Sequence, residues 1–384
     1  MEYDFDTIIP RRGTGSYKWD TPASPETLPM WVADMDFRTA PEVRAALQRR
    51  LEHGIFGYTK VPAAYYEAAI DWFRRRHGWS FQPEWVIYTS GVVPALSAII
   101  QALTEPGDKV LVQTPVYNCF FSSIRNSRCI VQENPLRYEN GLYSIDYEDL
   151  EAKAADPEVK LMLLCNPHNP SGRVWSPEEL QRIASICERH GVFVVSDEIH
   201  GEIIAPGFRY TPFASLSESA LGGSVTCISP SKAFNIAGLQ VANIVCADDA
   251  IRRRIDRAIN VNEVCDINSF AVPALIAAYN EGEPWLRALN AYLHENDKCV
   301  RAFFAQHLPQ YPMPPLEATY LEWIDCRASG QDGDAIASLL LERGLMVNPG
   351  SMYGEQGRPF IRLNIACPRA LLHRGLEILR TTLG

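Results

Sequence analysis

The chain has no long apolar run, no secretory leader pattern and no excess of positive charge. None of its 384 residues belongs to an uninterrupted apolar stretch of about 18 residues, so we expect no membrane span. The first residues lack the basic and apolar regions of a signal peptide, which favours a cytoplasmic protein. The net charge of −10 disfavours nucleic acid and anionic membranes as partners.

Clustered metal ligands and paired cysteines are also missing. The ten cysteines are scattered without the C-x-x-C spacing, and the eight histidines form no H-E-x-x-H motif. Several cysteines, among them Cys165, Cys227 and Cys246, lie inside apolar runs and are interpreted as small buried residues in a reducing compartment. The composition therefore excludes a disulfide scaffold, and we expect no metal site.

Short apolar runs alternate with helical patterns through the middle of the chain. Several of them are continuous in Val, Ile, Leu and Cys, as is typical of strands that are buried on both faces. These runs are KVLVQ (109–113), RCIVQ (128–132), KLMLLC (160–165), VFVVSD (192–197), SVTCIS (224–229) and VANIVC (241–246). The alternation predicts an α/β fold in which helices cover a mainly parallel sheet.

The two ends of the chain have a different pattern. Residues 1–42 have little periodicity and are predicted to form an extended arm that joins a small domain. Residues 43–280 are predicted to form the large domain, and residues 281–384 the small one. A long helical stretch is predicted from about residue 275 to Gln306, followed by strand-like TYLEWIDC and PFIRLNIAC and a final helix.

Polar residues follow four of the predicted strands. In an open parallel sheet the carboxyl ends of the strands meet at one edge, where ligands bind. Asn169 follows one strand, Asp197 ends the next, and Lys232 follows a third. After VIYTSG (86–91), Gly91 opens a helix whose free N–H groups suit an anion, although an ordinary Ser N-cap at this turn is the alternative.

Lys232 and Asp197 give this set a chemical meaning. A lysine shielded from water can be neutral and form a Schiff base with an aldehyde, although most single lysines are surface residues. A buried carboxylate can keep a pyridine nitrogen protonated, as it does beside a lysine-bound pyridoxal phosphate. The lysine, carboxylate, amide and anion-binding turn are together the parts that a pyridoxal phosphate site needs.

Four motifs occur in order along the chain: N-P-x-N-P-x-G at 166–172, D-E-I-H at 197–200, S-P-S-K at 229–232 and R-L-N at 362–364. With this set the sequence resembles the fold-type I pyridoxal-phosphate enzymes of the aminotransferase class I/II superfamily. Four further segments resemble its cystathionine β-lyase (C–S lyase) branch, typified by MalY and PatB: LPMWVADMDF (28–37), HGIFGYT (53–59), YTSGVVPALS (88–97) and SKAFNIAGLQ (231–240). The resemblance implies a large cofactor-binding domain with a mainly parallel seven-stranded sheet and a smaller α+β domain.

The resemblance implies a role for each residue around the cofactor ring. Lys232 would form the Schiff base, and Asp197 would pair with the pyridine nitrogen. Asn169 would bind the ring hydroxyl oxygen, and His200, which stands where many aminotransferases have tyrosine, can bind the same oxygen. Tyr117 would stack on the ring, with a core aromatic residue as the alternative.

The phosphate and the substrate involve further residues. By the resemblance, four residues of two turns would hold the phosphate: Gly91, Val92, Ser229 and Ser231. Tyr58 would reach the phosphate from the partner subunit, which implies a homodimer. Arg362 would bind the substrate carboxylate, with a surface salt bridge as the alternative. Ala33 would border the substrate pocket, with packing at the dimer interface as the alternative. Gln240 stands where many aminotransferases have an arginine for the phosphate.

The resemblance implies a C–S β-lyase that cleaves L-cystathionine or related cysteine S-conjugates to a thiol, pyruvate and ammonia. An aminotransferase acting on an amino acid and a 2-oxo acid is the alternative, because both reactions need the same cofactor motifs. A regulatory protein that binds the cofactor and a partner is a third hypothesis, although such a protein has no need of Lys232. The substitutions at His200 and Gln240 favour the lyase.

Overall fold

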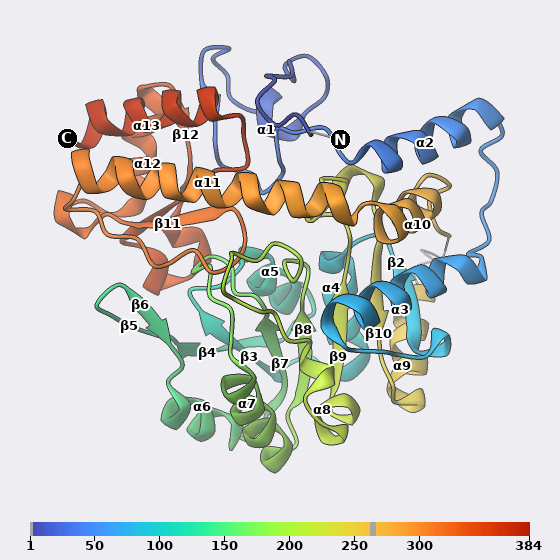
Figure 1. Cartoon of the computed structure of the whole chain (residues 1–384). Helices are drawn as coiled ribbons and strands as arrows, with labels where there is room; N and C mark the ends of the chain where they lie inside the picture. Colours follow the sequence, from blue (N-terminus) through green and yellow to red (C-terminus); the bar gives the residue numbers. More distant parts are fainter. Residues whose placement is uncertain (1–2, 262–265) are drawn as a thin grey trace.

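A seven-stranded sheet lies at the centre of the larger part of the molecule (Figure 1). The computed structural model describes residues 3–261 and 266–384. In sheet order the strands are β2 (Val86–Thr89), β10 (Ala242–Val245), β9 (Ser224–Ile228), β8 (Phe193–Asp197), β7 (Val159–Cys165), β3 (Lys109–Thr114) and β4 (Ile130–Pro135). Strand β10 runs antiparallel to both of its neighbours, β2 and β9, and the other neighbouring pairs of this sheet are parallel. The predicted mainly parallel sheet is confirmed, and all six apolar runs form its strands.

Helices cover both faces of this sheet, which explains why its strands are apolar throughout. Leu161 and Leu163 of β7 pack on one side with α4 (Val92–Leu103), α5 (Asn118–Asn126) and α9 (Asp249–Asn260). The alternating residues Met162 and Leu164 pack on the other side with α6 (Tyr147–Ala154), α7 (Pro177–His190) and α8 (Glu218–Gly222). Side chains of successive strand residues point to opposite faces, so both faces need apolar residues.

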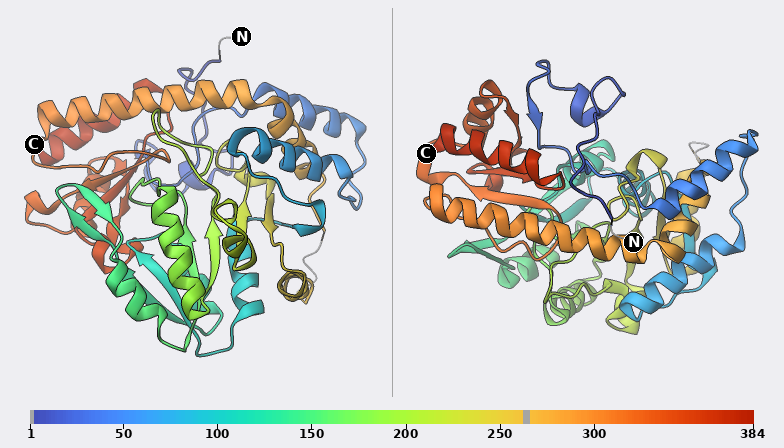
Figure 2. Two further views of the ribbon diagram at one scale, coloured as in Figure 1. Left: turned by 60° about the horizontal axis from the view of Figure 1, so that its bottom comes forward. Right: turned by 45° about the horizontal axis from the view of Figure 1, so that its top comes forward.

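The remaining helices join the sheet to the C-terminal part of the molecule. These are α2 (Pro41–His53), α3 (Ala63–His77), α10 (Ala271–Glu281) and α11 (Glu283–His307). The helical stretch predicted to reach Gln306 is two helices, because the chain breaks at Gly282. A Cβ atom there would lie 2.5 Å from the Phe234 ring, so this glycine lets the end of α10 approach Phe234. Figure 2 shows α11 running along one side of the molecule toward the C-terminal helix.

A three-stranded antiparallel sheet forms the core of the C-terminal part. Its order is β11 (Leu321–Asp325), β14 (Phe360–Asn364) and β13 (Asn348–Pro349). Helices α12 (Gly333–Glu342) and α13 (Arg369–Leu383) accompany it, and a hairpin of β5 (Arg137–Glu139) and β6 (Leu142–Ser144) stands apart. The strand-like segments TYLEWIDC and PFIRLNIAC thus form β11 and β14.

The N-terminal segment lies against the C-terminal part (Figure 1). It contains the short helix α1 (Tyr17–Asp20) and β1 (Leu28–Pro29), which pairs in parallel with β12 (Leu345–Met346). The Asn364 amide nitrogen also donates to the carbonyls of Val32 and Asp34. These contacts agree with the predicted joining of the arm to the small domain, and the domain boundaries stay a prediction. Among the helices of the described residues, none is long and apolar enough to cross a membrane.

Candidate active site

The carboxyl ends of β7, β8 and β9 bring the predicted polar residues to one edge of the large sheet. Asp197, the last residue of β8, is in register with Cys165 of β7 and Cys227 of β9. Residues that are directly opposite each other point to the same face of a sheet, so the carboxyl group lies between two buried thiols. Asn169 and Lys232 lie in the segments that follow β7 and β9.

Asp197 is a buried carboxyl group with few partners. Burial raises its pKa to about 6, against the opposing effects of the Ile199 N–H and the charge of Lys232. The Ile199 N–H donates to the carboxylate at 3.2 Å. A carboxylate in this setting favours a neighbouring positive charge, such as a protonated ring nitrogen.

Lys232 is partly buried, and its amine bonds to the backbone. Its Nζ atom donates to the Ala33 carbonyl oxygen at 2.7 Å. Burial, together with the charge of Arg362, lowers its pKa to about 8, while the charges of Asp34 and Asp197 oppose the shift. About a tenth of this amine is therefore uncharged at pH 7, far more than for an ordinary lysine, and the uncharged form is the one that acts as nucleophile or general base.

Arg362 on β14 faces Asn169 across the site. Its Nη1 atom donates to the Asn169 side-chain oxygen at 3.1 Å, and its Nη2 atom donates to the Trp31 carbonyl at 3.0 Å. The guanidinium carbon lies 5.0 Å from the centre of the Tyr353 ring. Arg362 is only 3% exposed and forms no ion pair within the described residues, so the surface salt bridge is excluded.

His200 lies near Lys232 and Arg362, and Tyr117 lies near Asp197 and Arg362. Burial, with the charges of Lys232 and Arg362, lowers the His200 pKa to about 3, so the imidazole is neutral. Its Nδ1 atom is buried and has no hydrogen-bond partner among the described residues. Burial, with Cys119 and Asp197 nearby, raises the pKa of Tyr117. Tyr117 stands at the start of α5, where Cys119 follows it.

Two turns at the same sheet edge contain the four residues that are predicted to bind an anion. Ser229 Oγ lies 2.8 Å from Ser231 Oγ, and the Ser231 N–H donates to Ser229 Oγ at 3.0 Å. Gly91 precedes α4, and Val92 is the first residue of that helix, whose first-turn N–H groups have no partners within the helix. Gly91 itself caps α4 without a side-chain bond, so the alternative of a Ser N-cap does not hold.

Tyr58 is not brought together with the other predicted residues within one chain. It lies between α2 and α3 and is 97% exposed. Ala33, in contrast, is at the centre of the site, because its carbonyl accepts bonds from Lys232 and also from the Tyr320 hydroxyl.

Sequence reasoning missed three side chains of the site. These are Cys119, Tyr320 and Tyr353. For Cys119 the available signal was its position two residues after Tyr117, whereas no motif marked the two tyrosines. The nine cysteines that the structure describes are all free thiols. Within residues 3–261 and 266–384, no cluster of histidine, cysteine and carboxylate side chains could hold a metal ion.

Whole-chain relatives show which family the protein belongs to. Cystathionine beta-lyase PatB of Bacillus subtilis is 44% identical and aligns with 99% of this chain and 100% of its own. Protein MalY of Escherichia coli is 36% identical over 97% of each chain. Cystalysin from Treponema denticola, a structure containing pyridoxal 5'-phosphate, superposes with a TM-score of 0.97 at 36% identity, covering 100% of this chain and 99% of its own.

The PLP-bound C-S lyase from Staphylococcus hominis superposes with a TM-score of 0.93 at 34% identity, covering 100% of this chain and 98% of its own. The family model for aminotransferase class I and II matches residues 28–379. The resemblance to the cystathionine β-lyase branch is thus confirmed by whole-chain relatives. The chain belongs to the aminotransferase class I and II family and has its fold-type I architecture.

Proposed function

We propose that this protein is a pyridoxal-phosphate-dependent C–S β-lyase that cleaves L-cystathionine or a related cysteine S-conjugate to a thiol, pyruvate and ammonia. Relatives named cystathionine beta-lyase and solved structures named C-S lyase support this reaction class. One observation carries the proposal. Lys232, whose pKa is lowered, follows strand β9, and the buried Asp197 ends the neighbouring strand β8.

The residues of the site fit pyridoxal phosphate group by group. Asp197 offers a carboxylate for the ring nitrogen, and Lys232 offers an amine for the aldehyde. The unpartnered Nδ1 atom of His200 and the amide of Asn169 can bind the ring hydroxyl oxygen. Gln240 is exposed and uncharged, so N–H groups and hydroxyls are left to bind the phosphate.

Each residue then has a defined task in the elimination. The bound cofactor supplies an electron-accepting ring that takes up the charge left when the substrate Cα loses its proton. Asp197 holds a proton at the ring nitrogen, and Lys232 removes the Cα proton as general base. Arg362 holds the substrate carboxylate with two N–H groups, which orients the Cα–H bond toward Lys232. The thiolate then leaves from Cβ as the C–S bond breaks, and water converts the remaining three-carbon enamine to pyruvate and ammonia.

We also propose a cytoplasmic homodimer in which Tyr58 reaches the cofactor phosphate of the partner subunit. The support is an apolar segment at the end of α2 and beyond it, where Leu51, Ile55 and Phe56 are 54%, 68% and 51% exposed. Exposed apolar residues gathered in one segment are typical of an interface. Sedimentation of the full chain tests the dimer, and Tyr58→Phe is expected to weaken cofactor binding several-fold. A monomer that retains full cofactor affinity contradicts this proposal.

Product analysis tests the reaction itself. The loaded enzyme incubated with L-cystathionine is expected to release thiol and pyruvate in equal amounts. A second incubation with an added 2-oxo acid measures any new amino acid. Dominant transfer of the amino group, without release of thiol, supports the aminotransferase and refutes the lyase.

Chemical trapping tests the assignment of the lysine. Reduction of the loaded enzyme with borohydride should place a pyridoxyl group on Lys232, as read by peptide mass mapping. Lys232→Ala should prevent this labelling and reduce pyruvate formation by several orders of magnitude. Lys160→Ala, at an exposed position near the start of β7, should change neither. Rapid pyruvate formation by Lys232→Ala contradicts the proposal.

A further inference from the structure

Tyr320, the residue before β11, shares a single hydrogen-bond acceptor with Lys232. The Tyr320 hydroxyl donates to the Ala33 carbonyl oxygen at 2.9 Å, and Lys232 Nζ donates to the same oxygen at 2.7 Å. Tyr320 is completely buried. Because a carbonyl oxygen has two lone pairs, these two donors occupy its full capacity.

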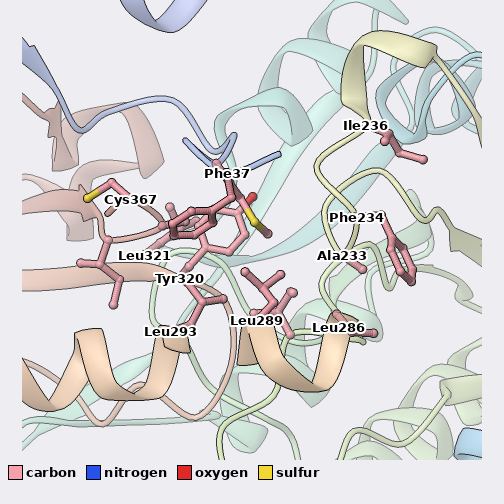
Figure 3. Packing of buried hydrophobic residues seen from close by; sticks show 14 of the residues in the cluster. Phe37, Ala233, Phe234, Ile236, Leu286, Leu289, Leu293, Tyr320, Leu321 and Cys367 are labelled. Atoms are coloured by element: carbon pink, nitrogen blue, oxygen red, sulfur yellow. The ribbon is translucent and has the colours of Figure 1, made fainter. Parts of the chain in front are cut away.

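Both partners of this shared oxygen are held in place by their surroundings. The Asn364 amide nitrogen donates to the carbonyls on either side of Ala33, those of Val32 and Asp34. Figure 3 shows Tyr320 with Leu289 of α11 in the same apolar cluster. Removing only the hydroxyl therefore leaves the ring and the Ala33 peptide where they are.

We propose that Tyr320 is a positioning residue that raises the uncharged fraction of the Lys232 amine by competing for the Ala33 carbonyl, where the amine rests whenever it is not bonded to the cofactor. The Tyr320 O–H points its positive end at the oxygen that the amine also uses. This arrangement disfavours an ammonium group more than a neutral amine, because only the ammonium carries a full positive charge. The inference rests on the proposed role of Lys232.

Other groups act on the same amine and remain unchanged in a Tyr320 variant. Charged and titratable side chains face Lys232 from four elements: Arg362 on β14, Asp34 in the N-terminal segment, Asp197 and His200 at the end of β8, and Cys119 in α5. Arg362 disfavours the ammonium form, while the acidic groups favour it. A difference between wild type and Tyr320→Phe therefore reports the hydroxyl alone.

Competitive acetylation across a pH series measures this effect. The full chain without cofactor is treated with trace acetic anhydride, and labelling of Lys232 is read by mass spectrometry relative to the exposed Lys160. In Tyr320→Phe the midpoint is expected to rise by about half to one pH unit, which slows Lys232 labelling at neutral pH about three- to tenfold. An unchanged or lowered midpoint overturns the proposal.

A matched variant controls for the loss of a buried tyrosine hydroxyl. Tyr311 is also buried and donates to a backbone carbonyl, that of Leu383 at 3.3 Å. Tyr311→Phe should leave the Lys232 midpoint unchanged. An equal rise in Tyr311→Phe overturns the proposal, because the effect is then not specific to the shared oxygen.

A second substitution gives the opposite sign and keeps the fold. 3-Fluorotyrosine introduced at position 320 alone makes the hydroxyl a stronger donor, so the midpoint of Lys232 should fall. A rise in this protein overturns the proposal. Loading wild type with pyridoxal phosphate should protect Lys232 from acetylation. Failure of that protection refutes the proposed role of Lys232, whereas the effect of Tyr320 on the cofactor-free chain is still measured.

Discussion

Replacing Asp197 by asparagine should stabilise the cofactor-free protein at neutral pH while it removes the proposed function. Burial raises the pKa of Asp197 from 3.8 to about 6. A difference of about two pH units corresponds to about 3 kcal/mol, by which the ionised carboxylate destabilises the folded state. Asparagine carries no charge, and its oxygen can still accept the bond that Ile199 N–H makes at 3.2 Å.

The sign and the pH window follow from the two protonation states. Below pH 3.8 the carboxyl group is protonated in the folded and the unfolded chain, so it contributes no difference. Between pH 3.8 and about 6 the folded chain retains a proton that the unfolded chain releases, so wild type loses stability as the pH rises. The stability advantage of Asp197→Asn therefore grows by about 3 kcal/mol from about pH 4 to above pH 6.

Urea denaturation of the cofactor-free chain at two pH values measures this change. Effects of the new amide on stability that do not depend on pH cancel when the variant's advantage over wild type is compared between the two pH values. Asp36→Asn is the control, for which the change in stability should have the opposite sign. Burial disfavours ionisation of Asp36, but its hydrogen bonds from Lys18 at 2.8 Å and Trp19 at 2.7 Å outweigh burial and lower its pKa. Asp36→Asn should be less stable than wild type at neutral pH, and this difference should shrink as the pH falls. A pH-independent difference for Asp197→Asn refutes the reasoning.

Three further substitutions test other features. Arg362→Lys should raise the KM for cystathionine about tenfold or more with a smaller change in kcat, because lysine cannot bind a carboxylate with two parallel N–H groups; steady-state kinetics decide, and an effect on kcat alone contradicts the assignment. Gly333→Ala should lower the free energy of unfolding by about 3 kcal/mol or more, because the new Cβ would lie 1.9 Å from the Phe360 carbonyl oxygen. Gly238→Ala is the control with a small expected effect, because a Cβ at that position has no atom within 4 Å. Ser176→Ala should cost about 1 kcal/mol in the same urea assay, through loss of the capping box that begins α7.

The central sheet was predictable because its strands are buried on both faces. A strand such as β7 must be apolar at every position, so its sequence differs from that of an amphipathic helix. The polar residues at the strand ends were predictable for a related reason, since parallel strands end at one edge. Asp197, Asn169 and Lys232 are therefore visible in the sequence before any contact is known.

The contacts between distant segments were not predictable in this way. Tyr320 and Ala33 are separated by 287 residues, and their hydrogen bond depends on how the N-terminal segment lies on the C-terminal part. The break between α10 and α11 does have a sequence signal, because Pro284 in the first turn of α11 lacks the N–H that a continuous helix needs. The close approach of Gly282 to Phe234 has no such signal.

The site brings together groups that are costly to bury without matched partners. Asp197 is held at a raised pKa and Lys232 at a lowered one, and Arg362 Nε and His200 Nδ1 are buried without hydrogen bonds to described residues. Each of these groups lowers the stability of the folded chain, since burial penalises unpaired polar atoms. A ligand that binds several of these groups at once removes their desolvation penalties together. This gain in stability adds to that from the ligand's other contacts. Pyridoxal phosphate should therefore raise the midpoint of thermal unfolding of wild type more than that of Asp197→Asn, because asparagine has already relieved one of these penalties and offers no carboxylate to the ring nitrogen.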